Sequence, residues 1–150
     1  RDPETIALAI TAADTGHWVI GTLHTSSASQ TIDRIIDVFP EGQQQQIRVQ
    51  VANSLVSVFA QTLLPKRQPD GSRKGRVMAQ EIKVVTPAIA NLIRESKAAQ
   101  IYSTIQTSSG AGMQTLESSL AELFKKGLVT IEDALSKSSK PNELKRLIQG

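Results

Sequence analysis

The spacing of apolar and polar residues divides the chain into two parts. Residues 1 to about 85 alternate between helical spacing and short β-rich runs, whereas residues 86–150 show helical spacing throughout. Helices that alternate with strands are typical of an α/β fold, and consecutive helices are typical of a separate helical layer. We therefore predict an α/β part at residues 1–85 and a C-terminal helical subdomain at residues 86–150.

Three helices are predicted in the first part. Asp2 stands at an N-cap position before Pro3 at the first helical position, and this helix is expected to end near Gly16. Ser27 and Gln30 have the spacing of a capping box and open a second helix. The predicted apolar stripes are Ile32, Ile35, Ile36 and Phe39 for the second helix, and Ile47, Val51, Leu55, Val58 and Phe59 for the third.

Two β-structures are predicted around these helices. Residues 18–23 are β-rich and nearly continuously apolar, which is typical of a strand covered on both faces in a parallel sheet. Residues 63–64 and 76–85 indicate paired strands joined through a turn at Pro69, Asp70 and Gly71. The fold class is therefore α/β, with mostly parallel strands plus a β-hairpin.

The second part is predicted to be all helical. Its helical segments centre on residues 89–95, 98–107, 113–126, 131–137 and 143–148. Gly127 is expected to end the third of them, and Thr130 is expected to cap the fourth together with Asp133. The connection at residues 108–112 lacks the spacing and the lysine of a phosphate-binding loop.

Composition limits the class of protein. The 150 residues include no cysteine, so disulfides and thiolate metal sites are excluded, and a cytoplasmic location is expected. No apolar run approaches the roughly 20 residues that span a bilayer. The chain starts at Arg1 without an initiator methionine, which suggests a segment of something longer.

The net charge of +3 comes from one place. Five basic residues stand against Asp70 between positions 66 and 76, a local charge of +4, and the rest of the chain sums to −1. Aromatic residues make up only 3% of the chain, which weighs against nucleic-acid binding. A solvated turn, or contact with an anionic surface, explains the patch. The basic residues are Lys66, Arg67, Arg73, Lys74 and Arg76.

Candidate chemistry gathers after the predicted strand at residues 18–23. His24, Thr25, Ser26 and Ser27 would lie at its carboxyl end and before a helix, where open α/β sheets bind ligands. His17 lies at the opposite end of the strand, so the two histidines are not expected to share a metal. A plain loop histidine is the alternative for His24. The residues alone describe part of a nucleotide-type α/β fold without its phosphate loop.

Residues 16–40, GHWVIGTLHTSSASQTIDRIIDVFP, resemble the histidine-box region of PilT-type ATPases, which retract type IV pili. Residues 1–5 look like the end of that family's Walker B segment. The likeness continues at residues 75–82, where the family has a G-R-V…E-I strand, at 86–95, and at 106–116. It covers residues 1 to about 137.

The resemblance implies the C-terminal half of a RecA-like ATPase domain from a cytoplasmic hexamer that powers twitching motility. ATP and Mg²⁺ would be bound mainly by residues upstream of this chain, so the segment alone would be inactive. His24 would sense the γ-phosphate, with Thr22 and Thr25 nearby, and His17 would be structural. Arg1 would lie beside the Walker B acid. No protein-bound metal site is expected within the chain itself.

Residues 86–95 resemble the A-I-R-N-L-I-R-E signature of retraction ATPases, which implies a motor-coupling helix; an ordinary packed amphipathic helix is the alternative. Ala90 departs from the signature, which has arginine there. The implied partners are an inner-membrane platform protein of the pilus and, through the basic hairpin, the membrane surface. The matching coupling residues are Ala88, Ile89, Asn91, Leu92, Ile93, Arg94 and Glu95.

Two other functions fit the sequence. A non-catalytic interaction module of the same fold would also lack the phosphate loop. A related secretion or pilus-assembly ATPase would share the fold, but those relatives carry a four-cysteine zinc module that this chain cannot form.

Overall fold

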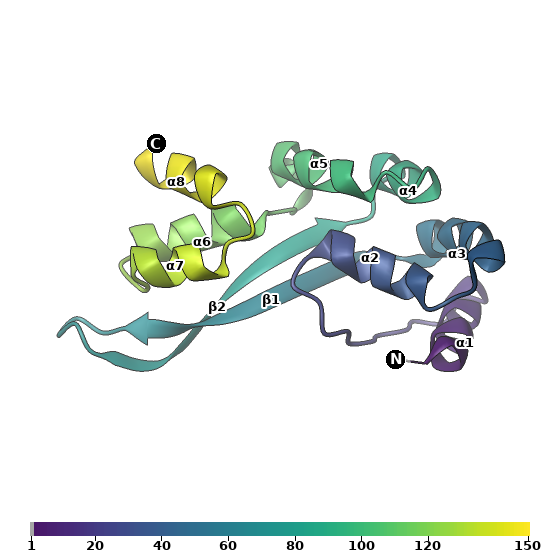
Figure 1. The fold of residues 1–150 in the computed structure, drawn as a ribbon, viewed down its shortest axis with the longest axis horizontal. Coiled ribbons are helices and arrows are strands. Elements are labelled where there is room, and N and C mark those ends of the chain that lie inside the picture. The colour runs from purple at the N-terminus through teal and green to yellow at the C-terminus, as the bar shows by residue number, and fades with distance from the viewer. Residues whose placement is uncertain (1) are drawn as a thin grey trace.

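A long antiparallel β-hairpin organises the computed structural model, which describes residues 2–150 except for the side chain of Ser109. Figure 1 shows the helices gathered along the hairpin, whose turn projects beyond them. The elements are α1 (Pro3–Asp14), α2 (Ala28–Asp37), α3 (Glu41–Ser54), β1 (Ser57–Arg67), β2 (Arg73–Val84), α4 (Pro87–Arg94), η1 (Ala98–Gln100), α5 (Ile101–Thr107), η2 (Ser109–Ala111), α6 (Leu116–Lys125), α7 (Ile131–Lys137) and α8 (Pro141–Gln149).

The hairpin contributes one face to two hydrophobic cores. Its register runs from Ser57 opposite Val84 to Pro65 opposite Arg76, with an irregularity before Arg67. The first core lies between the hairpin and helices α1 to α5, and the second lies between the hairpin and helices α6 to α8. Val58 belongs to the first core and Leu64 to the second. The two cores are therefore joined through β1 and β2.

The predicted helix boundaries are confirmed where capping residues fixed them. The backbone N–H of Gln30 donates to Ser27 Oγ at 3.2 Å, and that of Asp133 donates to Thr130 Oγ1 at 3.1 Å. Asp2 likewise caps α1 through the N–H of Thr5 at 2.8 Å. Gly127 follows α6 with φ +70°, a conformation that glycine adopts without strain. The α/β class, with a hairpin followed by helices, is confirmed as well.

The predicted buried strand at residues 18–23 is wrong. This segment is extended but unpaired, and the side chains of Trp18 and Ile20 are 78% and 82% exposed. A strand requires hydrogen bonds to a neighbouring strand, and the only sheet among residues 2–150 consists of β1 and β2. Mostly parallel strands are therefore not found in this part of the chain.

Two predicted helices are shorter than their apolar stripes suggested. Helix α3 ends at Ser54, and the stripe residues Val58 and Phe59 lie in β1 because that stretch pairs with β2. The helix expected at 113–126 starts only at Leu116, since Gln114 makes a bridge to Ile82. In both places, pairing with β2 overrides helical spacing.

Candidate functional site

The loop that carries His24 leads from α1 into α2. His24 and Thr22 are exposed, whereas Thr25 is half-buried, with its hydroxyl 2.7 Å from that of Thr31. The hydroxyl of Ser26 donates to Gln30 Oε1 at 2.8 Å. The last residues of the loop are therefore held against the first turn of α2, while the imidazole of His24 faces solvent.

The beginning of α2 is attached to the hairpin by a buried carboxylate. The backbone N–H of Ala28 donates to Glu81 Oε1 at 2.7 Å, and Glu81 is only 4% exposed. Burial raises the pKa of Glu81, and the hydrogen bond from Ala28 opposes that rise because it stabilises the charged form. This bond places the His24 loop next to β2.

Lys83 lies two residues further along the same face of β2 and is fully buried. Its Nζ makes no hydrogen bond within the described part of the chain, and the charges that act on it are Glu81 and Asp33. Burial lowers the pKa of Lys83 from 10.5 to about 8, although both carboxylates favour the charged amine. Its amine therefore has charged neighbours but no direct partner.

Sequence reasoning did not single out Glu81 or Lys83 as functional side chains. Glu81 and Lys83 lie on one face of β2. The opposite face, which includes Met78 and Ile82, is more apolar. Alternation by itself would place the charged residues in solvent. The signal that could have pointed to them is the match of Glu81 to the family strand.

His17 lies just after the C-terminal end of α1. Its Nδ1 is 3.2 Å from the carbonyl of Ala12 and 3.1 Å from the hydroxyl of Thr15. Among residues 2–150, no hydrogen bond joins it to His24, and no three His, Cys, Asp or Glu side chains gather as a metal site. Arg1, the remaining predicted site residue, lies outside the described residues.

The predicted coupling residues lie on and just after α4. Ile89 and Ile93 are buried and Leu92 is half-buried, whereas Ala88 and Asn91 are exposed. Their side chains therefore divide into a face that packs against the first core and a face in solvent.

The two charged coupling residues have different contacts. A guanidinium nitrogen of Arg94 donates to Asn53 Oδ1 on α3 at 2.7 Å, and Glu95 pairs with Lys97 at 2.7 Å. An open pocket of about 350 Å³ borders Arg94 and Ala90, at the position where the family signature has arginine. Hydrogen bonds within the described residues do not join this helix to the His24 loop.

The basic residues gather at the turn end of the hairpin, which projects in Figure 1. Arg73 pairs with Asp133 of α7 at 3.1 Å, and the N–H of Arg67 donates to the carbonyl of Leu128 at 2.8 Å. Lys74 and Arg76 are exposed. One side of the hairpin end is therefore attached to the helical part, and the other presents positive charge to solvent.

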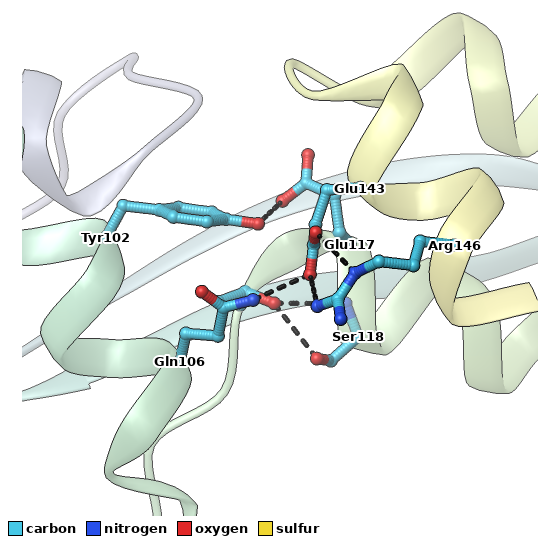
Figure 2. Close-up of polar contacts among 7 residues, drawn as sticks. Tyr102, Gln106, Glu117, Ser118, Glu143 and Arg146 are labelled. Carbon is cyan, nitrogen blue, oxygen red and sulfur yellow. Dashed lines mark hydrogen bonds and ion pairs between the residues drawn. The ribbon is translucent and has the colours of Figure 1, made fainter. Parts of the chain in front are cut away.

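A buried polar network organises the helical part. Glu117 of α6 is fully buried and accepts hydrogen bonds from Tyr102 Oη at 3.0 Å, Ser138 Oγ at 2.9 Å and the N–H of Lys140 at 3.1 Å. Figure 2 shows Tyr102 directed at Glu117, and Gln106 of α5 and Arg146 of α8 both directed at Glu143. Burial, together with the Glu117 charge, raises the pKa of Tyr102. The network fixes α5, α6 and α8 relative to one another.

These features describe an α/β chain in which one β-hairpin supports two hydrophobic cores, and the family follows from comparison with known proteins. The chain belongs to the type II/IV secretion system protein family, whose model matches residues 1–136.

Within that family, the chain is similar to pilus retraction ATPases. It is 53% identical over 141 residues to the type IV pilus retraction ATPase PilT of Pseudomonas aeruginosa, covering 94% of this chain and 40% of that protein. It is 51% identical over 134 residues to a twitching motility protein of Neisseria gonorrhoeae, covering 89% and 35%. The crystal structure of the pilus retraction motor PilT with bound ADP superposes with a TM-score of 0.85 at 46% identity, covering 97% of this chain and 39% of that one. The chain thus spans about two fifths of the length of these relatives.

Among residues 2–150, no helix has the length and apolar character that a bilayer crossing requires.

Proposed function

We propose that this chain is the C-terminal portion of a hexameric ATPase motor that powers type IV pilus retraction, and that it supplies γ-phosphate sensing and mechanical coupling. The observation that carries the proposal is the exposed His24 on a loop held at the hairpin, within a chain 53% identical to a retraction ATPase. ATP hydrolysis would belong to the full-length protein, and this segment alone would be inactive.

The side chains of the loop fit one part of nucleotide binding. An exposed imidazole at His24 and a hydroxyl at Thr22 can donate hydrogen bonds to a terminal phosphate, and Thr25 lies beside them. The sequence has no phosphate loop, and residues 2–150 hold no carboxylate cluster for Mg²⁺. ATP and Mg²⁺ would therefore be bound mainly by upstream residues, Arg1 would lie beside the Walker B acid, and His17 would remain structural.

Sensing follows from the chemistry of the terminal phosphate. A donor at His24 that bonds to the γ-phosphate loses its acceptor on hydrolysis, so the loop relaxes. The coupling helix would transmit the change to the rest of the motor through Arg94 and Glu95, which already bind different neighbours.

The partners are part of the same proposal. The motor would be a homo-hexamer in the cytoplasm, peripheral to the inner membrane, and would act on a membrane platform protein of the pilus. The basic end of the hairpin would face anionic headgroups.

The test compares the two histidines in the full-length protein. We expect His24→Ala to lower ATP hydrolysis by roughly 10- to 100-fold with ADP affinity preserved, because one transition-state contact is lost. His17→Ala, the matched control, should change hydrolysis by no more than about twofold, since that side chain only caps α1.

Two outcomes would contradict the proposal. Wild-type hydrolysis by His24→Ala would remove the sensing role. Tight ATP binding by the isolated 150-residue chain in calorimetry would show that the phosphate site lies inside it.

A further inference from the structure

One carboxylate links two parts of the chain that lie far apart in sequence. Glu81 accepts the N–H of Ala28 across 53 residues, and both residues are buried. The first N–H groups of a helix have no partner within the helix, so an outside acceptor decides where the helix begins. The hydroxyl of Ser27 takes the N–H of Gln30, and Glu81 takes that of Ala28.

The edge of β2 that does not pair with β1 is bound to the helical part. Ile82 and Gln114 exchange two backbone hydrogen bonds, at 2.9 and 3.0 Å. The N–H of Gln80 donates to Ser119 Oγ of α6 at 3.1 Å. Glu81 therefore lies between the His24 loop and the residues that begin the helical subdomain.

Lys83 is one of the groups that act on the charge of Glu81. The amine is buried without a hydrogen-bond partner, and Glu81 and Asp33 of α2 act on it electrostatically. Glu117 of α6 acts on Glu81 in the opposite sense, because it is a second negative charge. The N–H of Ala28 and the charge of Lys83 both favour the ionised form of Glu81, and burial and Glu117 oppose it.

We propose that Glu81 is a positioning residue for the His24 loop and that β2 passes displacements of the loop on to Gln114 and α6. This inference rests on the proposed sensing role of His24. Loss of the Glu81 contact leaves His24 present but removes the hydrogen bond that holds its loop to β2. The loop then no longer reports the state of the nucleotide.

The test uses Glu81→Ala in the full-length protein. We expect faster hydrogen exchange at the Ala28 amide and a fall in kcat of about tenfold, with KM for ATP changed by no more than about twofold, since upstream residues bind the nucleotide. Glu81→Gln keeps an oxygen acceptor and should restore slow exchange and most of kcat. Glu122→Ala, which removes an exposed carboxylate paired with Lys126, is the control and should behave as wild type.

A second variant separates positioning from folding. Glu81→Ala leaves the amine of Lys83 buried without the negative charge that acts on it most strongly, and Lys83→Met in the same chain removes that amine. We expect the double variant to regain the melting temperature of the wild type but to keep the fast exchange at Ala28 and the low kcat. Recovery of all three would show that Glu81 acts only through stability and would overturn the inference.

His24→Ala distinguishes this inference from the function on which it rests. Low activity of His24→Ala together with wild-type activity of the double variant would overturn the positioning role alone. Wild-type activity of His24→Ala would overturn the sensing role, and the inference with it.

Discussion

At the scale of single residues, two buried charged side chains, Glu117 and Lys83, differ in their hydrogen bonds. Glu117 is fully buried and accepts hydrogen bonds from α5 and from the connection between α7 and α8, so its desolvation is compensated. Lys83 is equally buried, but no residue in the described range 2–150 accepts a hydrogen bond from its amine. A buried charge without such a partner costs stability. The burial of Glu117 is therefore better compensated than the burial of Lys83.

Lys83→Met should stabilise the protein at pH 7 by roughly 1 to 3 kcal/mol, because it replaces a poorly compensated buried amine with an apolar chain of similar length. The pKa of Lys83 is about 8 in the folded protein and 10.5 ordinarily, so between these values the unfolded chain binds more protons. The free energy of unfolding of the wild type should therefore rise with pH across that window. Urea unfolding at pH 7, 9 and 10 measures the effect.

The variant supplies its own control. The difference between wild type and Lys83→Met cancels the titration of groups that do not interact with Lys83, and it should shrink as the pH rises from 8 to 10.5. A difference that stays constant over this range, or a variant less stable than wild type at pH 7, would show that the amine is compensated in the folded protein.

At the scale of elements, capping residues correctly predicted the ends of helices, because a helix end depends on neighbouring residues in the sequence. Thr130 with Asp133 fixed the start of α7, and Gly127 fixed the end of α6. The strand predicted at residues 18–23 was wrong because a strand needs a partner strand, and β-rich composition does not supply one. The prediction that Val58 and Phe59 belong to a helix was wrong for the reverse reason. These residues pair with β2, and helical spacing carries no information about a partner strand.

Two isoleucines test the exposure of residues 18–23 in the 150-residue chain. Ile20→Ala should change the free energy of unfolding by less than about 0.5 kcal/mol, because this side chain is 82% exposed. Ile32→Ala, the matched substitution at a fully buried position of α2, should cost about 2 to 5 kcal/mol. Equal and large losses in chemical denaturation would mean that residues 18–23 form a buried strand after all.

At the scale of the whole molecule, the hairpin carries both cores and divides its remaining surface by chemistry. Its outer face exposes Phe59, Leu63 and Met78, and its turn end carries the basic residues. The net charge of +3 is thus concentrated at one extremity of the molecule (Figure 1). A local charge of +4 at a projecting end can bind an anionic surface even though the rest of the chain is nearly neutral.

Charge removal at this extremity tests the proposed membrane contact. Lys74→Ala with Arg76→Ala should weaken binding to vesicles that contain phosphatidylserine by roughly 1 kcal/mol per charge, and salt should weaken the wild type in the same way. Cosedimentation with these vesicles measures the effect. Lys137→Ala with Lys145→Ala, on α7 and α8, is the matched control. Equal losses in both pairs, or binding to zwitterionic vesicles, would refute a contact through the hairpin end.

The sequence by itself determined the caps, most of the helices, the hairpin and the family, because these depend on neighbouring residues or on motifs such as residues 16–40. It also located His24 and the coupling helix as candidate sites. Only the tertiary structure decided which face of β2 is buried. Alternation favours Met78 and Ile82 as inward residues, yet Glu81 and Lys83 are the buried ones. The reason is a contact between residues far apart in the sequence. The N–H of Ala28 needs an acceptor, and no local sequence pattern predicts that a carboxylate 53 residues away supplies it.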